Sequence, residues 1–280
     1  MGIKASGISI ILIILVFLTV NSCKSDSINF SSLLGEMTDR ESITRFPNYT
    51  LKQISSWDRT QTSPEDQDTW FNNKDFGYSI RKEVKNGRDE YVIMDASGPG
   101  CIVRIWIPLD NFSKRTVRIY IDEMEKPVIE ENFNDLISGE SFIKEPFAFI
   151  SSDERNSVMQ YGLPVGHPKQ MGADLYLPIP FSKSCKITLD DNPFYYAISY
   201  RLYNPGTKVE SFSMKKFNKE HGKLESTSEK LTEKEIFKYN LKRKQILQPG
   251  DSLKFDLPEG SKAVRSLKIK LDSEKEQKSR

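Results

Sequence analysis

Apolar and polar side chains alternate with a period of two along several short stretches between residues 102 and 202. Because successive side chains of a β-strand point to opposite faces, each stretch predicts a strand with one buried face. Turn residues separate the stretches, about one turn every dozen residues. Many short strands with regular turns predict an all-β fold, a β-sandwich or a jelly roll, in place of an alternating βα fold. The clearest alternating sets are Val103, Ile105 and Ile107; Val117, Ile119 and Ile121; Ile187 and Leu189; and Tyr196, Ile198, Tyr200 and Leu202.

A charged stretch follows the predicted sandwich and is rich in Lys and Glu. Its apolar residues over 229–241 are too sparse for a strong amphipathic stripe, which predicts a solvated connection with one or two marginal helices. Alternation returns at 253–257 and 267–271 and predicts two more strands. Two strands are not stable alone, so they either join the first sheet or open a second domain that this chain does not finish. The predicted segments are a signal peptide over 1–22, a polar lead-in over 23–50, the sandwich over 51–212, a charged connection over 213–250 and the start of an incomplete second β domain over 251–280.

The N-terminus has the pattern of an export signal. Lys4 precedes an apolar run from Ile8 to Val20, which is too short to span a bilayer as a helix. Ser22 stands directly before Cys23, and a small residue at that position is what a bacterial lipoprotein signal peptidase accepts. We therefore predict an exported bacterial lipoprotein, anchored in the periplasm or at the outer membrane surface through a lipidated Cys23. An ordinary signal peptide with an incidental cysteine is the alternative.

Composition and charge narrow the chemistry. The 41 Lys and Arg nearly balance the 39 Asp and Glu, so the net charge of +2 creates no long-range field that favours nucleic acid. Two His and three Cys do not supply a repeated zinc framework, and the sequence contains no Gly-rich phosphate loop or Gly-x-Ser-x-Gly elbow. We therefore expect no metal, no cofactor and no nucleic-acid partner. Cys101 and Cys185 remain as buried free thiols or as a disulfide, which requires their Cα atoms to lie within about 7 Å.

The segment Trp57–Asp58–Arg59 is the strongest candidate binding motif. Its aromatic ring is suited to stack on a sugar face while its carboxylate and guanidinium hold the sugar hydroxyls. A loop with a structural Asp–Arg ion pair is the alternative interpretation. Trp70 and Trp106 are further candidates for a carbohydrate platform, although Trp106 alternates with core residues and is equally suited to covering the sheet.

Candidate acid–base groups are harder to rank. A glycosidase needs two carboxyl groups about 5 to 10 Å apart, and sequence does not show which pairs converge. Most of the candidates are expected to be surface charges. They are Asp122, Glu123, Glu125, Glu130, Glu131 and Asp135. His167 and His221 lack the nearby Ser, Cys or Asp pattern that would indicate a catalytic triad.

Short motifs occur in a fixed order along the chain. They are LGEMTDR at 34–40, SSWDR at 55–59, GPG at 98–100 followed by IVRIW at 102–106, VRIYID at 117–122, YLPIPF at 176–181 and YYAISY at 195–200. Together, over residues 33–271, they resemble the N-terminal part of glycoside hydrolase family 172, once called domain of unknown function 2961. An ordered set of this length is more specific than any single motif.

The resemblance implies a first jelly roll followed by a second, a homo-trimer or hexamer, and action on furanosides with arabinofuranosyl or fructofuranosyl linkages. It also implies substrate contacts at Trp57, with Asp58 and Arg59 as ligands of the sugar hydroxyls. The family's two catalytic glutamates lie in a Gly-Glu-Gly-Asp-Glu and a Gly-Thr-Gly-x-Glu-Asp segment, and neither segment occurs here. No catalytic residue is therefore assigned. We expect the N-terminal fragment of a lipid-anchored glycosidase that is inactive alone; the alternative is a complete, non-catalytic glycan-binding or structural surface lipoprotein.

Overall fold

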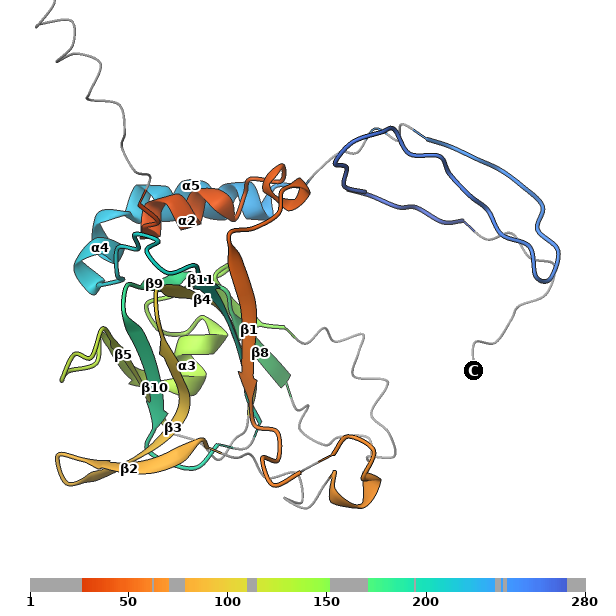
Figure 1. Ribbon diagram of the computed structural model, residues 1–280. Helices are drawn as coiled ribbons and strands as arrows, with labels where there is room; N and C mark the ends of the chain where they lie inside the picture. The colour runs from red at the N-terminus through yellow and green to blue at the C-terminus, as the bar shows by residue number, and fades with distance from the viewer. Residues whose placement is uncertain are drawn as a thin grey trace, which may run out of the picture.

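The computed structural model confirms the predicted β-sandwich, in which two antiparallel sheets enclose one core (Figure 1). A few short helices accompany the sheets. The residues described are 27–61, 63–70, 79–109, 115–151, 171–193, 195–234, 238 and 241–270.

The first sheet carries six strands in the order β1-β11-β4-β8-β7, with β9 paired to β4 beside β8. Its strands are β1 (Tyr49–Ser55), β4 (Gly100–Leu109), β7 (Ala148–Ile150), β8 (Met171–Leu175), β9 (Ile179–Phe181) and β11 (Ala197–Tyr203). The second sheet has five strands in the order β2-β3-β10-β5-β6. They are β2 (Arg81–Lys85), β3 (Arg88–Ser97), β5 (Thr116–Ile121), β6 (Ile129–Asn132) and β10 (Ser184–Leu189).

The predicted alternation places the expected side chains in the core at nearly every position. Ile105, Ile119, Ile187 and Ile198 are all buried between the two sheets. Leu202 and Val103 are the exceptions, and at Val103 the cause is an extra residue in β4 opposite the Ser199–Tyr200 step of β11. Such a bulge turns the following side chains to the other face, so Ile102 enters the core in place of Val103.

An N-terminal helix occupies part of the segment that the sequence pattern described as a polar lead-in. Helix α2 (Phe30–Glu36) begins at a capping box formed by Asn29 and Ser32. Its residues Phe30, Leu33 and Leu34 are buried. Their spacing of three and four residues puts them on one face of the helix, which explains why a segment with polar flanks packs onto the sandwich.

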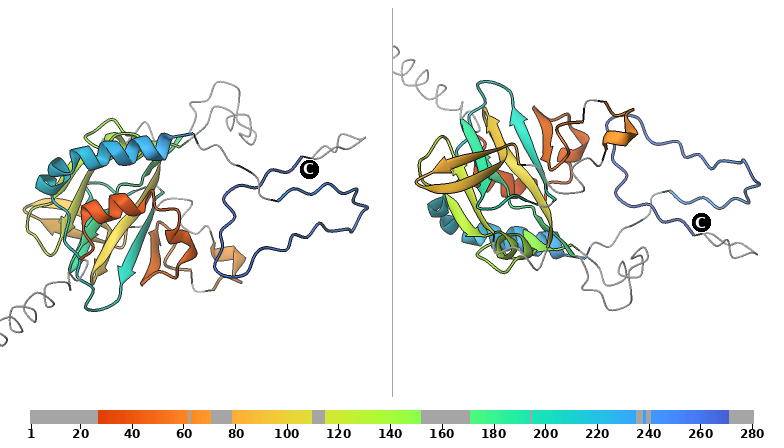
Figure 2. Two further views of the ribbon diagram at one scale, coloured as in Figure 1. Left: turned by 90° about the horizontal axis from the view of Figure 1, so that it is seen from above. Right: turned by 90° about the horizontal axis from the view of Figure 1, so that it is seen from below.

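Helices also form in the predicted charged connection, closer to the sandwich than expected. They are α4 (Met214–Lys219) and α5 (His221–Thr232). Helix α5 therefore overlaps only the first residues of the 229–241 stretch. Leu224 and Thr227 of α5 are buried, and α5 contacts α2. Figure 2 shows the two helices over one end of the sandwich. The remaining helices are α3 (Phe133–Ser138) and the 3-10 turns η1 (Ser42–Thr44) and η2 (Gln67–Thr69).

The strands predicted at 253–257 and 267–271 are not formed in the described part of the C-terminal segment, which ends at residue 270. Residues 241–270 follow an extended course without strand pairing (Figure 1). Most of their alternating apolar side chains are exposed, including Leu257, Leu267 and Ile269. Two strands without a partner sheet bury too little surface to be stable, and among the described residues no sheet lies against this segment. A second β domain stays a prediction.

Of the helices within the described ranges, none is long and apolar enough to cross a bilayer. The predicted signal peptide over 1–22 and Cys23 lie outside the described residues.

Candidate functional site

The Trp57–Asp58–Arg59 segment lies at the end of β1, where the chain leaves the first sheet. Trp57 is 54% exposed, whereas Asp58 is only 4% exposed. The Oδ1 atom of Asp58 accepts hydrogen bonds from the backbone N–H of Thr60 at 2.9 Å and from its hydroxyl at 2.6 Å. Asp58 thereby fixes a tight turn, and this turn holds the Trp57 ring out into solvent.

Arg59 folds back across this turn. Its Nη2 donates to the carbonyl oxygen of Ser55 at 2.9 Å and to the hydroxyl of Tyr196 at 3.4 Å. Its guanidinium carbon lies 5.5 Å from the centroid of the Trp57 ring, within the range of a cation–π contact. Burial raises the pKa of Tyr196 although the Arg59 charge opposes this shift, so the phenol stays neutral at physiological pH. Trp57 and Arg59 thus form one small polar and aromatic surface above the buried Tyr196.

Strand register connects this surface to the rest of the first sheet. Ser55 pairs with Ala197, Ala197 with Trp106, and Trp106 with Asp174, so one row crosses four strands. Because their neighbours along each strand enter the core, the side chains in this row point away from it. We call this side of the first sheet its outer face. Trp106 therefore lies on the same face as the start of the Trp57 turn.

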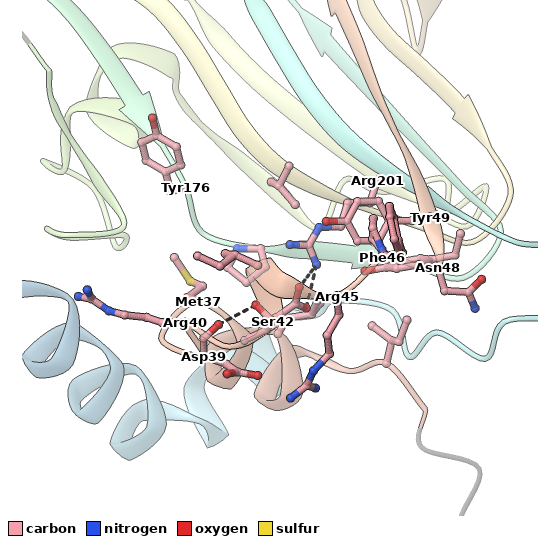
Figure 3. Close-up of a pocket in the computed structure, with 18 of the residues that line it drawn as sticks. Met37, Asp39, Arg40, Ser42, Arg45, Phe46, Asn48, Tyr49, Tyr176 and Arg201 are labelled. Carbon is pink, nitrogen blue, oxygen red and sulfur yellow. Dashed lines mark hydrogen bonds and ion pairs between the residues drawn. The ribbon is translucent and has the colours of Figure 1, made fainter. Parts of the chain in front are cut away.

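A pocket of about 940 Å³ opens at the other end of β1, between the outer face and the segment that follows α2. Arg201 of β11 lies on its floor, where its Nη1 is 2.8 Å from both carboxylate oxygens of Glu36. Its guanidinium carbon also lies 4.6 Å from the centroid of the Tyr49 ring. Figure 3 shows Arg201 against Tyr49, with Tyr176 on the opposite side of the pocket.

The electrostatics of the pocket floor are dominated by the Arg201–Glu36 pair. Burial alone would lower the pKa of Arg201, but the hydrogen bonds and the charge of Glu36 outweigh it and raise that pKa. Burial also raises the pKa of the neighbouring Tyr203. The pocket floor therefore presents a fixed ion pair beside an aromatic ring, and Asp39, Arg40, Arg45 and Arg265 add further charges to the lining. Sequence reasoning did not select Glu36 or Arg201, because they are 165 residues apart and only the fold brings them together.

The carboxylates considered for acid–base work are spread over the β5–β6 hairpin and α3, not over the outer face. Asp122 has a backbone φ of 55° in the hairpin turn. Its carboxylate accepts hydrogen bonds from the backbone of Ser182, Lys183 and Ser184 and from the hydroxyls of Ser182 and Ser211. Burial raises its pKa, but these hydrogen bonds outweigh burial and lower it. Asp122 therefore acts as an anchor of the fold.

The other carboxylates have ordinary surface surroundings. Glu130 lies on the edge strand β6 and accepts a hydrogen bond from Nε of Arg118 at 2.7 Å. Glu123 and Glu125 are exposed in the hairpin turn, Glu131 lies on β6, and Asp135 is exposed in the first turn of α3. Within the described ranges, no group of three or more His, Cys, Asp or Glu side chains is arranged to hold a metal ion.

His221 and Trp70 have contacts within their own local segments. His221 begins α5, and its Nδ1 lies 3.5 Å from an Oε of Glu225 on the exposed side of that helix. Trp70 is half-exposed, and its indole N–H donates to the carbonyl oxygen of Pro64 at 3.0 Å. His167 lies outside the described residues.

Cys101 and Cys185 are both buried as free thiols, which settles the alternative of a disulfide between them. Burial raises the pKa of Cys101 to about 12. It raises the pKa of Cys185 as well. Because the thiolate is the nucleophile, neither side chain is suited to covalent chemistry at neutral pH.

Comparison with protein families adds independent information about the ligand. A family model described as "GH172 first beta-sandwich domain" matches residues 47–220, which is more than half of the chain. The match includes β1, the Trp57 turn and all strands of both sheets. A search of curated proteins gave no match.

Proposed function

Because the chain belongs to glycoside hydrolase family 172, we propose that its sandwich binds furanoside glycans through the outer face of the first sheet, at Trp57. Membership of this family makes carbohydrate the general ligand class. Arabinofuranosyl and fructofuranosyl linkages are the specific ligands that we propose.

The exposure of Trp57 is the observation that carries this proposal. A large apolar ring that is 54% exposed and fixed by a hydrogen-bonded turn is a ready platform for the C–H face of a sugar. Arg59 stands beside the ring, where its guanidinium is placed to donate charge-assisted hydrogen bonds to sugar hydroxyls. Asp58 is proposed as the third ligand. Its burial and its bonds to Thr60 mean that it also holds the other two residues in position.

We propose that this chain does not hydrolyse glycosides by itself. Its 280 residues contain neither of the two glutamate segments that the resemblance to the family implies. A glycosidase needs a pair of facing carboxyl groups, and on the β5–β6 hairpin Asp122 and Glu130 are engaged in contacts within the fold. Binding without bond cleavage is also what the alternative of a non-catalytic glycan-binding lipoprotein requires.

Export, lipidation and assembly complete the proposal. The apolar run before Cys23 supports a signal peptide, and a lipid on Cys23 would hold the protein at a membrane surface. A homo-trimer or hexamer is proposed from the family resemblance alone. Mass spectrometry of the N-terminal peptide from a bacterial host tests the anchor, because an acylated Cys23 supports it and an unmodified later residue contradicts it.

Isothermal titration calorimetry tests sugar binding. The chain from residue 24 is titrated with arabinofuranosyl and fructofuranosyl oligosaccharides, beside a Trp57→Ala, Asp58→Ala double variant. Trp70→Ala is the matched control, because it removes an exposed ring that lies further along the β1–β2 connection, outside the hydrogen-bonded Trp57 turn. We expect saturable binding by the unaltered chain and by the control, and loss of binding in the double variant. Absence of binding by the unaltered chain contradicts the proposal.

An activity assay tests the proposal that this chain does not hydrolyse glycosides by itself. The same preparation is incubated with arabinofuranosyl and fructofuranosyl substrates, and released sugar is measured. We expect none above the uncatalysed rate. Turnover comparable with that of a family member that contains both glutamate segments would show that catalytic groups exist in this chain.

A further inference from the structure

We propose that Trp106, together with the ion pair of Arg104 and Asp174, forms a second sugar subsite on the outer face. This inference rests on the proposed function and extends it from a single contact at Trp57 to an oligosaccharide track. Trp57 then binds one sugar unit, and Trp106 binds another further along the same sheet.

The position of Trp106 on the sheet is the first observation. Ile105 and Ile107 on either side of it enter the core, so the Trp106 indole lies on the outer face, where it is partly buried and partly exposed. Its register partner Ala197 is followed across the sheet by Ser55, two residues before Trp57. Neighbouring strands are about 4.8 Å apart, so Trp106 and the Trp57 turn are separated by about two strand spacings.

The close packing of the Trp106 indole ring over Gly172 is the second observation. A Cβ atom on Gly172 of β8 would lie 2.7 Å from Nε1 of Trp106 and 3.3 Å from Oγ of Ser151. Only glycine admits the edge of the ring at this place without displacing it. The ring is therefore held against the sheet in one position, as a stacking platform requires.

Arg104 and Asp174 supply fixed polar groups beside the ring. Nε of Arg104 lies 2.7 Å from Oδ1 of Asp174; the Arg104 side chain is 36% exposed and that of Asp174 only 6%. Burial alone would lower the pKa of Arg104, but the hydrogen bond and charge of Asp174 outweigh it and raise that pKa. A guanidinium that is oriented by a buried carboxylate and still reaches solvent is suited to donate hydrogen bonds to vicinal hydroxyls.

Aromatic rings continue the track toward the pocket. Tyr176 follows β8 and stacks on Phe149 of β7, with ring centroids 6.0 Å apart and an angle of 21° between the planes. Tyr176 also lines the 940 Å³ pocket. Since β1 rises about 3.3 Å per residue from Tyr49 to Ser55, the outer face extends about 20 Å between the pocket and the Trp57 turn. That length exceeds a single sugar ring, so one oligosaccharide is able to contact both ends.

Calorimetry with arabinofuranosyl oligosaccharides of increasing length tests the second subsite in the chain from residue 24. Trp106→Ala removes the ring, and Gly172→Ala displaces it while leaving its chemistry intact. We expect each variant to bind the longer oligosaccharides at least about tenfold more weakly, the loss of one stacked contact. Binding of the disaccharide is expected to change less than about twofold, because Trp57 is untouched. Trp70→Ala should bind every length as the unaltered chain does.

Two results would overturn the inference, and they are distinguishable. If the unaltered chain binds the oligosaccharides and both variants bind every length equally well, the second subsite is wrong while binding at Trp57 stands. If the unaltered chain binds none of them, the proposed function fails and the subsite fails with it. Thermal unfolding identifies a variant that does not fold. In that case Tyr176→Ala, at an exposed position on the same track, takes its place with the same expected loss for long oligosaccharides.

Discussion

The hydroxyl of Tyr120 donates to both carboxylate oxygens of Glu90, at 2.8 and 3.0 Å, and so closes a buried polar network in the second sheet. Glu90 is fully buried. It also accepts a hydrogen bond from the Thr188 hydroxyl at 2.8 Å and one from Nε of Arg88 at 2.8 Å. A buried carboxylate is tolerated only where donors surround it, and here three strands supply them.

Tyr120→Phe removes one donor from this network and is expected to lower the free energy of unfolding by about 1 to 3 kcal/mol, because a buried charged acceptor loses a hydrogen bond. Urea unfolding followed by circular dichroism measures the change. Val84→Ala, on the exposed face of the neighbouring edge strand, is the control and should change stability by less than about 0.5 kcal/mol. An equal effect in both variants would show that the network adds nothing to the fold.

Acid is expected to lower the free energy of unfolding, because Asp122 and Glu90 become protonated. In both carboxyls burial raises the pKa, but hydrogen bonding outweighs burial and holds it below the ordinary value. The unfolded chain then binds more protons at low pH, so the stabilisation is complete above about pH 5 and is lost as the pH falls through the lowered native values. Urea unfolding at a series of pH values measures this loss.

In that experiment, Asp122→Asn distinguishes the effect of the carboxylate charge from the effect of the backbone conformation at the turn. Asparagine tolerates the positive φ of 55° at this turn, so the variant keeps the backbone and loses the carboxylate. We expect a less stable protein at neutral pH with a flatter decline toward acid. Asp89→Asn, which affects only an exposed pair with Lys82, should keep the steep decline. A decline in Asp122→Asn as steep as in the unaltered chain contradicts the assignment.

Two glycines give opposite predictions for the same substitution. A Cβ on Gly100 would lie 2.3 Å from Cζ of Phe181 and 2.6 Å from the carbonyl oxygen of Arg201, whereas one on Gly222 in α5 meets nothing within 4 Å. Gly100→Ala should therefore lower the unfolding free energy by about 1 to 3 kcal/mol through overpacking. Gly222→Ala should leave it unchanged or raise it by up to about 1 kcal/mol through helix propensity. Thermal unfolding that ranks them in the reverse order would contradict the packing at β4.

The Arg201–Glu36 pair joins α2 to the first sheet, and breaking it should loosen that contact. Glu36→Gln leaves the Arg201 guanidinium, whose side chain is 19% exposed, without its counter-charge. The expected cost is about 1 to 3 kcal/mol in unfolding free energy. Glu41→Gln is the control, since its pair with Arg45 is exposed and 3.9 Å long. Hydrogen exchange should show faster opening of α2 in Glu36→Gln alone, and unchanged exchange there would contradict the role of the pair.

Much of the fold was predictable because period-two alternation is a local signal. It identified β5, β10 and the inward residues of β11, and it failed at Val103 because a bulge depends on the partner strand. It also missed α2, whose three buried side chains stand among polar neighbours. The alternation at 253–257 predicted a strand that is not formed in the described residues, since alternation reports suitability for a sheet and not the presence of a partner.

The candidate site was predictable only in part. The residue types of Trp57 and Arg59 already suggested a sugar contact, and the structure places them together at the end of β1. Contacts that join distant segments, such as Arg104 with Asp174, have no local signature because the two residues are 70 positions apart. The sequence indicated surface positions for most carboxylates of the β5–β6 hairpin, but it does not show that Asp122 accepts hydrogen bonds from five donors.

The indole N–H resonances of the three tryptophans test the central claim most directly. The chain from residue 24, labelled with ¹⁵N-tryptophan, is titrated with an arabinofuranosyl oligosaccharide, and each signal is assigned by replacing Trp57, Trp70 or Trp106 in turn. Sugar binding on the outer face predicts that the Trp57 signal shifts saturably with added oligosaccharide while the Trp70 signal stays in place. A saturating shift confined to Trp70, or no shift at Trp57 at concentrations where calorimetry detects binding, would contradict it.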